Sequence, residues 1–245
     1  MQPTPRPEDR NNKTYVPALG YHALSRLYDR VVAVTMRESV WRSRLVALIA
    51  PQPGERILDV GCGTGTLAVA LKLSEPRTEI TGIDPDGQII ELARQRAAAA
   101  GVTIEFVHGL AQEAGLASTL AGRCFDKIVS SLVFHHLDEA TKRDVLAAMA
   151  RLLDPTRGRL IILDWGAMPG VMTRLRFLPV QLLDGFDNTR ANVEGRMPQL
   201  LVEAGFKVIE TPWTFETTFG PLATWIAERD RKVLGFGSAT AKSRP

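Results

Sequence analysis

The chain has 245 residues, of which 45% are hydrophobic, and this is enough to form one α/β domain around a single core. Its 30 basic and 27 acidic residues give a formal charge of +3, and the basic residues are spread along the chain, which argues against a nucleic-acid-binding protein. Cys62 and Cys124 lie far apart without a CxxC pair, so we expect no disulfide framework and no metal. No apolar run is long enough to cross a bilayer; we therefore expect a cytoplasmic protein, with contact at a membrane surface left open.

The N-terminal region divides into a tail and a helical part. Residues 1–18 are rich in proline, asparagine and charge, which predicts a flexible tail. From residue 19 to 50 apolar residues recur every three or four positions, which predicts one or two amphipathic helices, and Pro51 and Pro53 end this region.

The middle of the chain alternates between short β-branched runs and longer helical runs. Strands are expected at 56–60, 78–83, 103–107, 125–133 and 158–165, and helices at 66–73, 87–100 and 140–153. Gly101 is a candidate residue for ending the second helix, and Asp138 a candidate N-cap for the third. This alternation predicts a doubly wound, mostly parallel α/β sheet.

The last part of the chain is predicted to add an antiparallel edge to the sheet. Residues 205–222 are expected to form two more strands joined at Pro212, with a helix from Leu222 onward. We find no internal repeat.

The strongest motif is ILDVGCGTG, a buried strand that leads into three glycines and a helix. Glycines at alternate positions, Gly61, Gly63 and Gly65, allow a sharp turn and let a ligand lie against bare backbone beside a helix N-terminus. Asp59 is expected at the carboxyl end of the strand, where it can accept hydrogen bonds from a ligand ammonium group or a water molecule.

An acidic residue follows at the end of the second strand. Asp84 lies 23 positions after Gly61 and can accept hydrogen bonds from both ribose hydroxyls of an adenosine. One alternative is an ordinary turn in which Asp84 caps the next helix before Gln88. Another is an NAD(P)-dependent oxidoreductase, but its fingerprint requires a glycine or alanine where this chain has Thr66.

From about residue 19 to 222 the sequence resembles the class I S-adenosylmethionine-dependent methyltransferases, in particular the bacterial ubiquinone, menaquinone and phospholipid N-methyltransferase branch. The resemblance rests on LDVGCGTG, GIDPD, VHGLAQE, FDKIVSSLVFHHLD and GRLIILDW. It implies a seven-stranded Rossmann-like domain over residues 19–245, with a helical lid at 19–50, an acceptor-site cap at 166–200, and S-adenosylmethionine as cofactor. The residues it implies for cofactor binding are Asp59, Gly61, Cys62, Gly63, Thr64, Gly65, Asp84, Pro85, Leu110, Ala111, Gln112 and Ser131.

The chain departs from the family pattern at the adenine site. The family usually has an aspartate at the position of Leu110, where it accepts a hydrogen bond from the adenine amino group. Backbone groups of Leu110 and Ala111, the side chain of Gln112, or apolar packing of Leu110 on the ring are the alternatives here.

The candidate catalytic residues are His135 and His136, which follow the fourth parallel strand and titrate near neutral pH. A base is required only when the acceptor must lose a proton, and aligned approach to the methyl carbon can supply most of the rate. Either histidine can instead bind backbone or line the pocket. In the quinone methyltransferases these two positions are usually arginine and asparagine, so a quinone mechanism is not transferred to this chain.

The candidate acceptor-site residues are Tyr28 and Trp165, although each can also be a core residue. Between Met172 and Phe186 apolar side chains alternate with Arg174 and Arg176, which suits a cover for an apolar acceptor or contact with anionic lipid; a helix packed on the domain is the alternative.

The sequence therefore predicts a methyltransferase that acts on a small molecule, for which a lipid or quinone-like compound is the candidate. A non-catalytic S-adenosylmethionine-binding protein is the alternative, and Leu110 is the residue that favours it. A nucleic-acid or protein methyltransferase is disfavoured, because no basic stripe, recognition domain or NPPY-like segment is found. Oligomeric state is not predicted.

Overall fold

The computed structural model describes residues 37–111 and 120–230, so the predicted tail and most of the predicted helical lid lie outside these residues. The helices and strands are, in chain order, α2 (Glu38–Ile49), β1 (Arg56–Val60), α3 (Thr66–Ser74), β2 (Glu79–Asp84), α4 (Gly87–Ala99), β3 (Glu105–His108), β4 (Lys127–Ser131), the 3-10 helix η1 (Phe134–His136), α5 (Glu139–Leu152), β5 (Arg159–Trp165), α6 (Val171–Asp184), α7 (Phe186–Val193), α8 (Met197–Glu203), β6 (Phe206–Glu210), β7 (Thr214–Glu216) and β8 (Pro221–Arg229).

One mixed sheet runs through the molecule in the order β3-β2-β1-β4-β5-β8-β6, and the short β7 pairs with β8. Strands β1 to β5 are mutually parallel, whereas β8 is antiparallel to β5, β6 and β7. The predicted doubly wound fold is confirmed, and the sheet has eight strands where seven were expected because β7 adds a short pairing. The order reverses between β1 and β4, and ligands of open α/β sheets bind beyond the carboxyl ends of strands at such a point.

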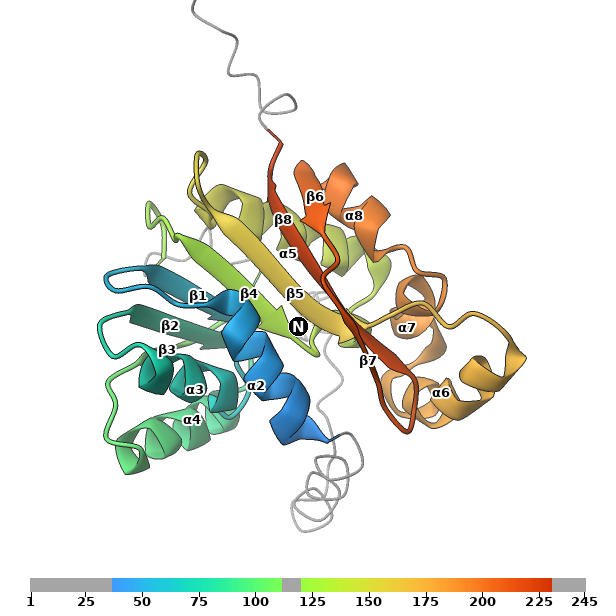
Figure 1. The fold of residues 1–245 in the computed structure, drawn as a ribbon, viewed down its shortest axis with the longest axis horizontal. Helices are drawn as coiled ribbons and strands as arrows, with labels where there is room; N and C mark the ends of the chain where they lie inside the picture. The colour runs from blue at the N-terminus through green and yellow to red at the C-terminus, as the bar shows by residue number, and fades with distance from the viewer. Residues whose placement is uncertain (1–36, 112–119, 231–245) are drawn as a thin grey trace, which may run out of the picture.

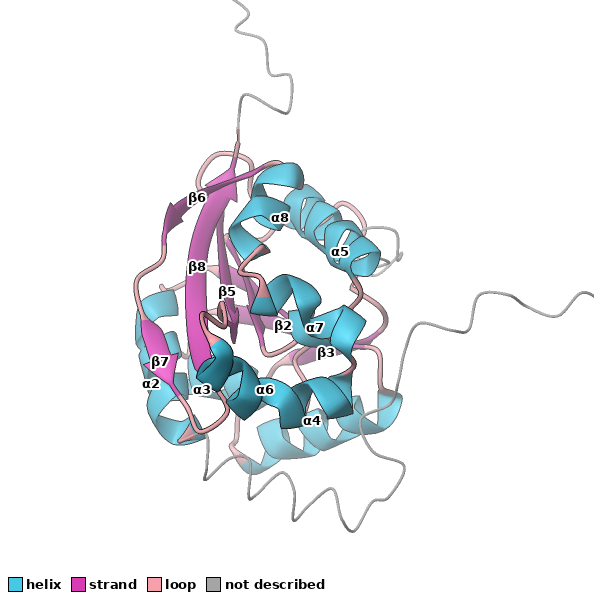
Figure 2. Cartoon of the chain, turned by 90° about the vertical axis from the view of Figure 1, so that its right-hand side faces the viewer, coloured by secondary structure: helices cyan, strands magenta, loops and turns pink. Residues whose placement is uncertain are grey.

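Two layers of helices cover the sheet (Figures 1 and 2). One apolar cluster joins α2, α3 and α4 to one face, through side chains that include Trp41, Leu67 and Ile90. A second cluster joins α5, α7 and α8 to the other face, through side chains that include Leu146 and Leu200. Because both faces of the central strands are buried, these strands read as continuous apolar runs.

Local chemistry explains several element ends. Asp138 caps α5 by accepting a hydrogen bond from Thr141 N–H, as predicted, and Gly101 follows α4 at φ +67°. The cap of α4 is Asp86, whose carboxylate accepts from the backbone of Gln88 and Ile89. The alternative in which Asp84 caps α4 is therefore wrong, and Asp84 is left for another role.

The prediction of a helix from Leu222 onward is also wrong. Residues 221–229 form strand β8, which lies between β5 and β6, and its tight connection to β7 runs through Gly220. The antiparallel strand is thus an interior strand of the sheet, where the sequence suggested a hairpin at its edge. Strand β8 is buried on both faces over Leu222–Trp225, so the period-two alternation that marks a half-buried strand is absent.

The predicted cap, residues 166–200, contains α6, α7 and the start of α8. Helix α7 packs on the sheet side of this region, where Thr189, Ala191 and Asn192 are buried. Helix α6 buries Phe177 and Val180 but exposes several apolar side chains. Within the described ranges, no helix has the length and apolar character needed to span a membrane.

Candidate functional site

The glycine loop joins β1 to α3 at the carboxyl edge of the sheet. Gly61, Gly63 and Gly65 all have positive φ, and the backbone N–H groups of Gly61 and Cys62 both donate to Ile83 O. A Cβ on Gly61 would lie 2.3 Å from the Val133 side chain, whereas a Cβ on Gly63 would meet nothing within 4 Å. The loop therefore packs closely under η1 at Gly61 and leaves bare backbone open at Gly63.

Asp59 carries a buried carboxylate next to this loop. It is 1% exposed, and neither carboxylate oxygen has a hydrogen-bond partner in the described part of the chain. Burial, and then the nearby Asp84 charge, raise its pKa to about 7, while Arg42 and the Ala68 N–H act in the opposite direction. An unpaired buried carboxylate is costly, so it indicates a site that a cationic or hydrogen-bonding ligand completes.

Asp84 lies at the end of β2 and braces the glycine loop. Its Oδ2 accepts from Gly63 N–H at 2.9 Å, and its Oδ1 accepts from Asp86 N–H at 3.0 Å. Burial raises its pKa, and these two backbone N–H groups oppose that shift. Each oxygen keeps a free lone pair, so the carboxylate can still accept hydrogen bonds from a pair of hydroxyls.

The remaining predicted cofactor residues near this edge of the sheet differ in how far their side chains are exposed. Cys62 points into the core, where burial raises the pKa of its thiol, so only its backbone is available. Thr64 and Pro85 are half-buried beside the loop, as are Leu110 and Ala111 after β3. Gln112 and the acceptor-site candidate Tyr28 lie outside the described residues.

Asp164 organises the segment that carries the two histidines. Its buried carboxylate accepts hydrogen bonds from the backbone of Val133, Phe134 and Trp165, from Asn192 Nδ2, and from His135 Nδ1 at 2.9 Å. Burial opposes the charged carboxylate, but His135 and these donors hold the pKa of Asp164 below its usual value. The bond to Asp164 assigns the proton of neutral His135 to Nδ1 and leaves Nε2 as an acceptor.

The second histidine, His136, is paired with Asp184 at the end of α6. His136 Nδ1 lies 3.1 Å from Asp184 Oδ1, and the two histidine rings are 4.0 Å apart between centroids. Burial disfavours the charged imidazole, but Asp184 outweighs it and raises the pKa of His136. For His135 burial and the neighbouring His136 prevail and lower the pKa. The two imidazoles therefore differ: His135 is buried and neutral, whereas the side chain of His136 is 47% exposed and more basic.

The sequence did not single out Asp184, Asn192 or Lys142. Asp184 ends α6, Asn192 bridges Asp164 and the Trp165 carbonyl from α7, and Lys142 is fully buried on α5. Burial lowers the pKa of Lys142 to about 8, and its amine donates to the carbonyls of Leu137 and Asn188. The polar residues within the otherwise apolar 172–186 segment were the available indication for Asp184.

Two more features lie between the loop and the histidines. Ser131 ends β4 half-buried, and the next residue, Leu132, has φ +57°, a strained conformation for a leucine. Trp165 is 3% exposed and packs edge-on against His135 and Phe177, with centroids 6.2 and 5.1 Å away. The indole thus lies between the histidine pair and the cap.

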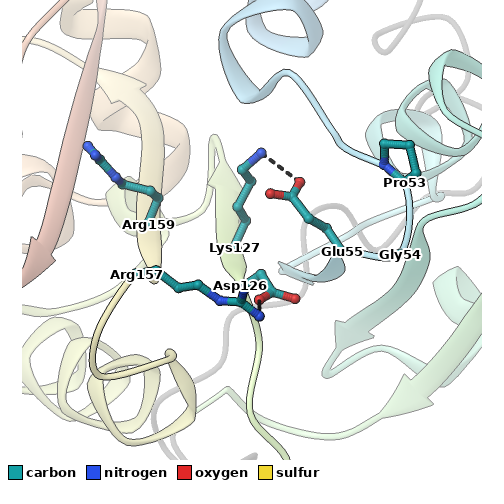
Figure 3. A pocket seen from close by; sticks show the side chains of 7 residues that line it. All are labelled: Pro53, Gly54, Glu55, Asp126, Lys127, Arg157 and Arg159. Atoms are coloured by element: carbon teal, nitrogen blue, oxygen red, sulfur yellow. Dashed lines mark hydrogen bonds and ion pairs between the residues drawn. The ribbon is translucent and has the colours of Figure 1, made fainter.

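A separate cavity of about 230 Å³ lies at the opposite edge, where β1, β4 and β5 begin. Figure 3 shows that its charged side chains largely satisfy one another, since Lys127 pairs with Glu55 and Arg157 with Asp126. Its position and internal pairing separate it from the glycine loop and the histidines.

Residues 57–156 match a family described as "Methyltransferase domain". This match spans the glycine loop, Asp59, Asp84 and both histidines. The matched part of the chain is a class I S-adenosylmethionine-dependent methyltransferase domain.

The methyltransferase domain resembles curated demethylmenaquinone methyltransferases in sequence. A demethylmenaquinone methyltransferase of Thermotoga maritima is 32% identical over 138 residues, which are 56% of this chain and 55% of that protein. The same enzyme of Deinococcus radiodurans is 33% identical over 155 residues, 62% of this chain and 61% of that protein. The aligned part thus spans little more than half of these relatives.

Solved methyltransferases share the fold. Magnesium protoporphyrin IX methyltransferase of Synechocystis PCC 6803 with bound SAH has a TM-score of 0.62 at 20% identity, over 81% of this chain and 87% of that one. The mitomycin 7-O-methyltransferase has the same TM-score and identity, over 86% of this chain and 58% of that one.

The residues of the methyltransferase domain fit S-adenosylmethionine. The unpaired carboxylate of Asp59 suits the ammonium of its methionyl part, the open backbone at Gly63 can approach the ligand closely, and Asp84 keeps lone pairs for ribose hydroxyls.

Proposed function

We propose that this protein transfers the methyl group of S-adenosylmethionine to a small apolar acceptor, which is lipid- or quinone-like. The observation that carries the cofactor half of the proposal is the buried Asp59 carboxylate, without a partner among the described residues, beside the glycine loop. The cofactor supplies a methyl group on a sulfonium centre, which needs an aligned nucleophile. The protein's task is then to place the acceptor and exclude water.

The acceptor half rests on what lies beyond β4 and β5. Ser131 and Trp165 end these strands, the two histidines follow β4, and α6 extends the same edge. Six of the nine exposed large apolar side chains in the described ranges lie between Val171 and Phe186: Val171, Met172, Leu175, Leu182, Leu183 and Phe186. We call this set, which ends at the first residue of α7, the apolar face of α6. Concentrated exposure of this kind marks a binding surface, and it suits an apolar acceptor or the lipid from which that acceptor is taken.

The histidines give the site a way to remove a proton. With Nδ1–H of His136 held by Asp184, its Nε2 lone pair is left for an acceptor hydroxyl, and His135 is oriented in the same way by Asp164. The similarity to demethylmenaquinone methyltransferases supports an apolar ring as acceptor, but the histidine pair differs from the arginine and asparagine usual there. We therefore propose the chemical class and not a particular quinone.

The experiment incubates purified protein and methyl-labelled S-adenosylmethionine with an extract of its own cells, and then partitions the products between organic and aqueous phases. We expect label in the organic phase, above a Gly61→Arg control in which a large side chain fills the loop beside Val133. Label confined to the aqueous phase contradicts the apolar acceptor. Cofactor binding by calorimetry without transfer in any extract supports the non-catalytic alternative.

A further inference from the structure

The cluster formed by His135, His136 and Asp184 has the composition and spacing of a metal site. Each residue offers one ligand atom, and these three atoms all lie within 4.8 Å of one another. Asp184 Oδ1 is 3.1 Å from His136 Nδ1, and Asp184 Oδ2 is 3.7 Å from His135 Nε2. Ligand atoms that bind one zinc ion tetrahedrally at 2.0–2.1 Å are roughly 3.3–3.5 Å apart. The two separations, each to a different oxygen of Asp184, lie on either side of that value.

One contact in this cluster is incomplete without a cation. His135 Nδ1 donates to Asp164, so the Nε2 of the neutral ring is an acceptor. It faces a carboxylate oxygen of Asp184, which is also an acceptor, at a distance too long for a hydrogen bond. Two acceptors that face each other across 3.7 Å leave room for a positive ion between them.

The surroundings of His135 are those of a metal-binding histidine. Such a histidine commonly donates its other ring N–H to a carboxylate, which fixes the tautomer and the ring orientation. Asp164 does this for His135, and it is itself held by Asn192 and three backbone N–H groups. The cluster therefore has both an ordered set of ligands and an ordered support.

We propose that His135 Nε2, His136 Nδ1 and Asp184 bind a divalent transition-metal ion of the zinc, cobalt or nickel type. Two imidazoles and one carboxylate favour such ions over magnesium or calcium, which prefer sets made only of oxygens. Three protein ligands leave a coordination position open, and the exposed side of His136 gives access to it. The sequence predicted no metal because the two cysteines lack the spacing of metal ligands. That argument does not apply to a site made of two histidines and an aspartate.

The ion also bears on the proposed methyl transfer, and that part rests on the proposed function. With the ion bound, His136 Nδ1 carries no proton and the histidines no longer act as the base. An acceptor hydroxyl at the open position would instead have its pKa lowered, so that it loses its proton to water at neutral pH. Its oxygen would then form the bond to the transferred methyl carbon while the carbon–sulfur bond breaks, and the sulfonium leaves as a neutral thioether. A ring with a phenolic or enolic hydroxyl is the acceptor class that suits this arrangement.

The test titrates metal-free full-length protein with Co²⁺ and records visible absorption, without S-adenosylmethionine or acceptor. We expect saturation at one equivalent with an absorption spectrum of nitrogen-ligated, four- or five-coordinate cobalt, and competition by Zn²⁺. Asp184→Asn and His136→Asn are each expected to weaken binding at least about tenfold. Asp187→Asn is the matched control, because it removes a nearby exposed carboxylate whose one ion pair among the described residues is with Arg190.

The proposal is overturned if wild-type protein gives only the spectrum of hydrated cobalt, or if Asp184→Asn and Asp187→Asn bind Co²⁺ equally well. Either result would leave the cluster as two histidines paired with Asp164 and Asp184. Far-UV circular dichroism of each variant excludes unfolding as the cause of lost binding. Calorimetry with S-adenosylmethionine in metal-free protein separates this outcome from failure of the proposed function, because the cofactor site does not include these three residues.

Discussion

At the residue scale, Asp59 shows how a candidate ligand site can be recognised by buried oxygens that lack hydrogen-bond partners. Its two oxygens are buried without partners in the described part of the chain, although the Ala68 N–H of α3 acts on the carboxylate. Proteins seldom leave a carboxylate in this state, because the loss of hydration is not compensated. The site is therefore arranged for a ligand that brings its own donor.

Replacement of Asp59 by asparagine is expected to weaken S-adenosylmethionine binding by roughly 10–100-fold, as a charge-assisted hydrogen bond contributes about 1.5–3 kcal/mol. Isothermal titration calorimetry measures this change. Asp144→Asn on the exposed side of α5 is the matched control and should bind like the wild type. Equal affinity of both variants would exclude Asp59 from the cofactor site.

At the element scale, the glycine loop is constrained by η1 as well as by its own turns. Gly61 and Gly54 both have positive φ, but only at Gly61 would a Cβ collide with a neighbour, namely Val133. Gly54→Ala should therefore show the conformational cost alone, about 1–2 kcal/mol. Gly61→Ala is expected to lose more unfolding free energy in urea titrations and to lose cofactor affinity as well. A Gly61→Ala variant no less stable than Gly54→Ala would show that η1 moves away readily.

The apolar face of α6 makes a second prediction at this scale. Leu182→Glu is expected to change the unfolding free energy by less than about 0.5 kcal/mol, because the side chain is 68% exposed. It should nevertheless reduce methylation of organic-phase acceptors and sedimentation with anionic lipid vesicles. Val202→Glu on α8, 59% exposed, is the matched control. If both variants retain transfer and vesicle binding, the face has no part in acceptor delivery.

The elements also show which parts of the fold a sequence reveals. Strands β1 to β5 and helices α3 to α5 were predictable because runs of apolar residues change period where one element follows another. Strand β8 was mistaken for a helix because both of its faces are buried, so its apolar and polar residues do not alternate. That Asp84 lies beside the glycines was predictable, because their spacing follows the local strand-turn-helix geometry. Asp184 was not, because its contact with His136 depends on where α6 folds back on the domain.

At the scale of the whole molecule, the raised pKa of Asp59 makes stability depend on pH. The folded protein holds this proton up to about pH 7, whereas an unfolded chain releases it near the ordinary value of 3.8. Between these values the folded state binds more protons, so this group's contribution to stability falls as pH rises and is lost above about pH 7.

Urea titrations of the cofactor-free protein at pH 5 and pH 8 measure this effect. The lowered pKa of His135 acts in the opposite direction, so the comparison with Asp59→Asn isolates the carboxylate. We expect the wild type to lose more stability than the variant between the two pH values. An identical change in both proteins would mean that Asp59 titrates normally in the folded state.

The position of β8 has a consequence for how the chain is made. Strand β6 hydrogen-bonds in the sheet only to β8 among the described strands, and β8 is synthesised later. During translation the Phe206–Glu210 segment therefore leaves the ribosome before its neighbour exists. It can pair in the sheet only after about twenty further residues have been synthesised. The half of the molecule that carries the cofactor loop can assemble in that interval, because β1 to β4 pair among themselves. We therefore expect the pairing of β8 with β5 and β6 to complete the sheet last. If translation stops before residue 221, the edge of β5 stays unpaired and can hydrogen-bond to other chains.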